Sequence, residues 1–156
     1  MTTAIRKATL EDIPVLVDMM REFYAESDYP LDRDWAAGSF QALLRDEALG
    51  TAWIVSLDSE PAGYVVLTVR FSMEYGGLDA FIDDLFVRTE FRRRGLGRAL
   101  LKSLFDECVR RRVLAVHVEV GQDNDAAKAL YGGFGMRQGD DGRQKLTARL
   151  DVPPNA

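Results

Sequence analysis

The stretch AFIDDLFVRTEFRRRGLGRAL, residues 80–100, combines a β-strand pattern, a glycine-rich turn and the start of a helix. Residues 80–88 are rich in apolar and aromatic side chains, which favours a strand. Gly95 and Gly97 allow positive φ and close approach to the backbone, so N–H groups of the turn and the helix start can converge on an anion. The stretch therefore predicts a phosphate-binding turn. The alternative is an arginine-rich turn that only solubilises the start of the helix.

Charge singles out the same region. Residues 88–112 carry nine basic and three acidic side chains, a local charge of +6 in a chain of net charge −5, so the remainder carries −11. One basic cluster in an acidic chain favours a small polyanion held at one place, and argues against nucleic acid or an anionic membrane surface as a partner. The turn lacks the Gly-Lys-Ser/Thr ending of a P-loop and the G-x-G-x-x-G spacing of a dinucleotide site.

Strand and helix signals continue on both sides of this stretch. Strands are predicted at 4–8, 51–57, 62–71, 80–88, 114–120 and 145–150, and helices from the Thr9 cap to Tyr29-Pro30 and at 35–48, 97–111 and 124–132. The order β-α-α-β-β-β-α-β-α-β predicts an α+β domain with a mixed central β-sheet and helices on both faces. The unit 80–120 is β-α-β, so its two strands should be parallel. We expect a single domain over 1–150 and a frayed tail over 151–156.

Length and composition agree with one globular domain. The chain has 156 residues, 47% of them apolar and 29% charged. It has no apolar run of about 20 residues and no apolar signal core at its start, so we expect a cytoplasmic protein. Cys108 and His117 are the only residues of their types, which excludes an internal disulfide and a zinc site of such ligands. We expect Cys108 in the core and His117 as a hydrogen-bonded strand residue.

Two motifs give a family resemblance. Residues 82–97, IDDLFVRTEFRRRGLG, resemble the signature of the GNAT superfamily of N-acetyltransferases, a strand followed by Arg/Gln-x-x-Gly-x-Gly/Ala, which Arg92, Gly95 and Gly97 match. About 27 residues later, NDAAKALY at 124–131 resembles the superfamily's Asn-x-x-Ala-x-x-x-Tyr helix. Residues 5–12, IRKATLED, resemble its first strand and helix start, so the likeness spans nearly the whole chain.

One departure follows the second motif. The superfamily usually has Gly-Phe after the tyrosine helix, where this chain has GGFGM at 132–136. Glycine in a helix end costs up to about 1 kcal/mol relative to alanine, so we expect this helix to stop early.

The resemblance implies acetyl-CoA as the acetyl donor and no metal. It places the pyrophosphate on the turn, at Arg92, Arg93, Arg94, Gly95, Leu96, Gly97 and Arg98. It places the pantetheine arm along the strand backbone, at Leu85, Phe86 and Val87. Asn124 would hydrogen-bond the arm, and Tyr131 would lie near the thioester sulfur.

Acetyl transfer to an amine requires a proton acceptor, because a free alkylamine has a pKa of about 10.4 and is protonated at neutral pH. Asp83 and Asp84 are the candidates. Strand alternation places Asp83 with Leu85, and Asp84 with Ile82 and Phe86, so one of the two should reach the site. We favour Asp83, since the resemblance to polyamine-acetylating members puts an acidic residue there. Water as the acceptor, and an acidic pair at a solvated strand end, are the alternatives.

Tyr131 is the candidate proton donor to the leaving thiolate. The acidic remainder of the chain and the 82–87 segment favour a small cationic amine as acceptor. A protein lysine or N-terminus is the alternative acceptor, an acyl-CoA sensor is the alternative without catalysis, and a homodimer is left open.

Overall fold

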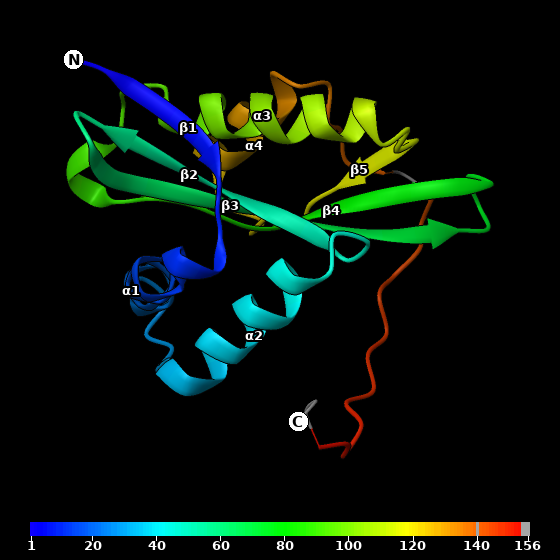
Figure 1. The fold of residues 1–156 in the computed structure, drawn as a ribbon. Coiled ribbons are helices and arrows are strands. Elements are labelled where there is room, and N and C mark those ends of the chain that lie inside the picture. Colours follow the sequence, from blue (N-terminus) through cyan, green and yellow to red (C-terminus); the bar gives the residue numbers. More distant parts are fainter. Residues whose placement is uncertain (140, 154–156) are drawn as a thin grey trace.

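The computed structural model describes residues 1–139 and 141–153, and its centre is a five-stranded sheet in the order β1-β2-β3-β4-β5 (Figure 1). The strands are β1 (Thr3–Lys7), β2 (Gly50–Leu57), β3 (Glu60–Ser72), β4 (Gly77–Val87) and β5 (Ala115–His117). The first four pair in antiparallel fashion, and β5 runs parallel to β4. The expected mixed sheet and parallel β-α-β unit are confirmed.

Helices cover both faces of the sheet, as expected (Figure 1). One face carries α1 (Ile13–Ala25) and α2 (Arg33–Arg45), and the other carries α3 (Leu96–Arg110) and α4 (Asp125–Gly132). Each pair of helices closes its own apolar core. None of the helices formed by the described residues is long and apolar enough to cross a membrane.

Side-chain hydrogen bonds stabilise two of the helix starts. A 3-10 helix, Leu10–Asp12, leads into α1, and Asp12 completes its capping box with Thr9 by accepting the Thr9 backbone N–H at 2.8 Å. Asp12 also accepts a bond from Arg6 at 2.7 Å, and these bonds lower the pKa of Asp12 to about 2, with the Arg6 bond as the largest cause. Asp32 accepts bonds from the N–H groups of the next helical turn, so α2 begins at Arg33, slightly earlier than the apolar pattern alone indicates. The expected early stop after the tyrosine motif is confirmed, since α4 ends at Gly132.

A β-bulge interrupts the pairing of β3 with β4. Val66 lies opposite Asp84, but its neighbour Leu67 lies opposite Ile82, so Asp83 is the extra residue. Ile82 and Leu85 consequently share the α3 core, whereas Asp84 bonds to a residue of the α1/α2 core. The expectation that Asp84 shares a face with Ile82 is therefore wrong, because strict alternation does not survive an inserted residue.

Two strand predictions fail near the end of the chain. The strand predicted at 114–120 pairs with β4 over 115–117, and its last pair, Phe81 with His117, comes just before the bulge. Residues 145–150 form no strand and run away from the sheet (Figure 1). A strand is held by ladder hydrogen bonds to a neighbour, and residues 145–150 pair with none of the five strands described.

Candidate active site

The candidate site lies where β4 and β5 stop pairing. After Phe81 and His117, no further ladder pair joins the two strands among residues 1–139 and 141–153. Leu85, Phe86 and Val87 follow on β4, which is paired there to β3 on its other edge. The backbone edge of 85–87 toward β5 is therefore open to an extended ligand bearing amides.

The glycine-rich turn stands at the end of this opening and caps α3. Arg93 and Gly95 have φ of 65° and 75°, both left-handed, and Gly95 is the N-cap residue. A Cβ built on Gly95 would meet no heavy atom within 4 Å, so the space beside it is open. The first N–H groups of an α-helix have no partner within the helix, and here they face a solvent-exposed turn. This geometry suits an anion.

The arginines of the turn differ in their surroundings: some contact other parts of the protein and others are exposed to solvent. Arg92 donates from Nε to the Val87 carbonyl at 2.8 Å and pairs with Glu26, the C-cap residue of α1, so it ties the turn to β4 and to the end of α1. Arg98 lies over the Phe134 ring, with Cζ 5.6 Å from the ring centroid. Arg93 and Arg94 are exposed. The turn is thus positioned by one arginine and presents others to solvent.

The structure brings the tyrosine helix against the same turn. A Cβ on Gly97 would lie 3.5 Å from Leu130 and 3.9 Å from Val87, so β4, α3 and α4 meet there. Asn124 caps α4 by accepting the Ala127 N–H at 3.1 Å, which uses only its side-chain oxygen. Tyr131 is 9% exposed, and burial raises its pKa.

The two candidate carboxylates lie at the bulge and line one pocket of about 450 Å³ beneath α2. Asp84 is half-buried and accepts a hydrogen bond from the Tyr64 hydroxyl at 3.0 Å. Burial raises the pKa of Asp84 to about 6, the charge of Asp83 adds to the rise, and the Tyr64 bond opposes it. Asp83 lies at the exposed edge, where partial desolvation and then the charge of Glu119 raise its pKa.

Tyr64 and Glu119 are site residues that the sequence analysis missed. Tyr64 is fully buried on β3, and Glu119 follows β5. Tyr24, in the last turn of α1, has a raised pKa, with burial as the main cause and the charges of Asp84 and Asp83 as further causes. Tyr29 and Trp35 are exposed. Only the register of the sheet reveals the Tyr64–Asp84 bond, because 20 residues separate the two in sequence.

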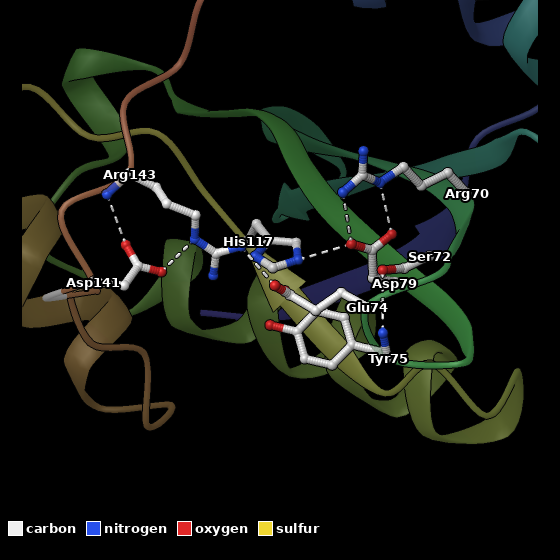
Figure 2. Close-up of polar contacts among 8 residues, drawn as sticks. All are labelled: Arg70, Ser72, Glu74, Tyr75, Asp79, His117, Asp141 and Arg143. Carbon is white, nitrogen blue, oxygen red and sulfur yellow. Dashed lines mark hydrogen bonds and ion pairs between the residues drawn. The ribbon is translucent and has the colours of Figure 1, made fainter.

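A second polar cluster surrounds Asp79 on β4 (Figure 2). The Asp79 carboxylate is fully buried and accepts two bonds from Arg70, at 2.8 and 3.0 Å. His117 Nε2 lies 2.9 Å from the same carboxylate. The Arg70 bonds are the largest cause that lowers the pKa of Asp79, followed among favourable contacts by His117. His117 is therefore hydrogen-bonded on its strand, as expected, and Cys108 is buried in the core, as expected.

Comparisons with known proteins agree with this geometry. The model of the acetyltransferase (GNAT) family matches residues 13–136. A candidate ribosomal protein bS18-alanine N-acetyltransferase of Bacillus subtilis is 28% identical over 136 residues, which cover 87% of this chain and 82% of that protein. The ribosomal protein bS18-alanine N-acetyltransferase of Salmonella typhimurium is 42% identical over 60 residues, covering 38% of this chain and 40% of that protein.

Solved structures share the fold. An integron cassette protein from the mobile metagenome of Cole Harbour Salt Marsh has a TM-score of 0.83 at 40% identity, over 96% of this chain and 91% of that chain. A predicted acetyltransferase of Clostridium acetobutylicum, solved with acetyl-CoA, has a TM-score of 0.77 at 18% identity, over 94% of this chain and 96% of that chain. At 18% identity, the likeness to the Clostridium acetobutylicum structure shows a shared fold alone.

The Tyr64 hydroxyl should control the protonation of Asp84. Tyr64→Phe removes the one bond that lowers the Asp84 pKa, so we expect that pKa to rise above 6, by roughly one unit for a bond to a charged group. Carboxyl carbon NMR across a pH titration measures the change. Tyr24→Phe is the control, because Tyr24 is not among the groups that shift the Asp84 pKa. An Asp84 pKa that stays the same or falls in Tyr64→Phe would contradict the assignment.

Proposed function

The chain belongs to the acetyltransferase (GNAT) family and is an N-acetyltransferase, and from this premise we propose that its acceptor is a small cationic primary amine. The observation that carries the proposal is the pair of aspartates at the bulge, which line one pocket and have raised pKa values. Negative charge beside the opening attracts an ammonium group, and a carboxylate with a raised pKa is a better proton acceptor near neutral pH.

On the donor side, the turn 92–98 would hold the pyrophosphate of acetyl-CoA through backbone N–H groups and exposed arginines. The left-handed Gly95, the open space beside it and the local charge of +6 support this assignment. The open edge at Leu85, Phe86 and Val87 would pair with the pantetheine amides, and Asn124 lies at the start of the adjacent helix. Bound in this way, acetyl-CoA supplies an acetyl thioester to the opening between β4 and β5.

On the acceptor side, Asp83 would take the proton of the ammonium group, and Asp84 would add negative charge behind it. The neutral nitrogen then forms a bond to the thioester carbonyl carbon as the bond from that carbon to sulfur breaks. Tyr131 would donate its hydroxyl proton to the departing thiolate, and the acylated nitrogen would release its second proton, which returns the Tyr131 phenolate to the phenol through solvent. Burial favours this role, since the raised pKa keeps the Tyr131 phenol protonated at neutral pH.

A protein N-terminus is the second candidate acceptor. Two of the relatives described above carry the name ribosomal protein-alanine N-acetyltransferase, one of them along most of this chain. The α-amino group of a basic peptide would also be attracted to an acidic opening. The two candidates differ in what surrounds the reacting amine, so direct competition distinguishes them.

Competition in one reaction tests the acceptor. Purified protein is given acetyl-CoA with equal concentrations of polyamines, aminoglycosides and basic peptides that begin with alanine, and the products are resolved by mass. We expect acetylated small amines to form at least tenfold faster than acetylated peptide. Faster peptide acetylation would overturn the small-amine proposal and favour the second candidate.

The proposed pyrophosphate-binding role of the turn 92–98 is tested at Gly95. Gly95→Val places a branched side chain in the open space of the turn and strains its φ of 75°, so acetyl-CoA affinity should fall at least tenfold by titration calorimetry. Gly76→Val is the matched control, because Gly76 has φ of 69° and equally open surroundings but lies in the loop before β4. Equal acetyl-CoA affinities in the two variants would show that the pyrophosphate does not bind at this turn.

The proton roles are tested by two conservative substitutions. Tyr131→Phe should lower kcat by about 10² to 10⁴ with little change in acetyl-CoA affinity, because it removes only the donor. Asp83→Asn should lower the plateau of the pH–rate profile by a similar factor. If Asp84 were the acceptor instead, Asp83→Asn would keep the plateau and move the acidic limb to lower pH, because the neighbouring charge that raises the Asp84 pKa is gone. An unchanged kcat in Tyr131→Phe would remove Tyr131 from the mechanism.

A further inference from the structure

The pocket beneath α2 carries charge only where the two aspartates line it. Among the residues that the structure describes, Asp83 and Asp84 are its only charged lining residues, and Ser39 and Thr68 are the only ones with hydroxyl groups. The other lining side chains are apolar. At about 450 Å³ the pocket has the size of a small-molecule site, in which an apolar lining holds the body of the ligand and a few polar groups orient it.

The pairing of the strands shows in which direction the apolar part of the pocket extends. Val66 of β3 lies opposite Asp84, and Thr68 lies two residues further along the same strand, beyond the bulge. Both side chains line the pocket, so it runs along β3 away from the carboxylates for about 7 Å, the rise of two strand residues. Leu49 continues the lining, because its chain neighbour Gly50 pairs with Thr68.

Helices α1 and α2 lie on the same face of the sheet (Figure 1) and cover the apolar part of the pocket. Met20 of α1 and Phe40 of α2 are buried, at 7% and 4% exposed, whereas Leu49 is 47% exposed. The pocket is therefore walled by the helices and open to solvent at Leu49. A hydrocarbon body bound there would remove the Leu49 side chain from water, which is favourable.

We propose that the acceptor is a monoamine, a primary amine with one ammonium group, which lies at Asp83 and Asp84 while its apolar body lies along β3 toward Leu49. An extended body of about six carbon atoms has the length of this part of the pocket. A second ammonium group at that distance, as in a polyamine, would lie among apolar side chains without a carboxylate to pair with, which costs desolvation free energy. The inference rests on the proposed function, because it takes the two aspartates as the place where the amine reacts.

Two amines of equal length test the proposal. Hexylamine and 1,5-diaminopentane differ only in whether the far end of the chain is a methyl or an ammonium group. With saturating acetyl-CoA, kcat/KM for hexylamine should exceed that for diaminopentane by at least about tenfold, after correction for the two amino groups of the diamine. From ethylamine to hexylamine, kcat/KM should rise by roughly fourfold for each added methylene that is buried.

A substitution at Leu49 should reverse this preference. Leu49→Glu places a carboxylate at the far end of the pocket, so the ratio of kcat/KM for hexylamine to kcat/KM for diaminopentane should fall by at least about tenfold. Leu10→Glu is the matched control, because Leu10 is 44% exposed, close to the 47% of Leu49, but does not line the pocket. The ratio should stay at the parent value in Leu10→Glu. Circular dichroism melting checks that both variants fold.

The outcomes separate this inference from the proposed function. If the parent acetylates diaminopentane as fast as hexylamine, the monoamine proposal is overturned, whereas a small cationic amine still stands as the acceptor. An unchanged ratio in Leu49→Glu would also overturn it, because the body of the amine would then lie elsewhere. If a basic peptide that begins with alanine is acetylated faster than every one of these amines, the proposed function is wrong and the monoamine proposal falls with it.

Discussion

One inserted residue, Asp83, organises the candidate site. Because β4 carries an extra residue opposite Val66 and Leu67, its ladder with β3 shifts register there. The pairing of β4 with β5 ends two residues earlier, at Phe81. The same insertion turns Asp84 toward Tyr64 while Leu85 remains in the α3 core. An open strand edge and a pair of carboxylates thus arise from one local change in the sheet.

Charge is divided between the two sides of this opening. The basic turn follows β4, whereas Asp83, Asp84 and Glu119 gather at the bulge and the end of β5. A polyanionic donor and a cationic acceptor would be attracted to different places and meet at the opening between the strands. The pKa values of Asp83 and Asp84 are raised chiefly by desolvation at the bulge, and the like charge of a neighbouring carboxylate adds to each rise.

Ion pairs hold the basic turn against the end of α1. Arg88 pairs with Glu22 at 3.0 Å, and Arg92 pairs with Glu26, so a residue in the last turn of α1 and the C-cap residue of that helix hold the chain between β4 and α3. Arg88 is largely buried, and its Nη1 also donates to the Pro61 carbonyl at 2.9 Å. A displacement of the end of α1 would therefore be transmitted to the turn through these two arginines.

The sequence by itself determined the features that depend on neighbours a few residues apart. The strand, turn and helix of residues 80–100, the Thr9 cap and the early end of α4 all follow from local patterns. Most strands, both pairs of helices and the family were predictable for that reason. Only the tertiary structure decided the bulge at Asp83, the Tyr64–Asp84 bond, the approach of Glu119 and the fate of 145–150. Each of these depends on register or on a partner distant in sequence, and an apolar alternation such as that of 145–150 specifies a strand without specifying which edge it pairs with.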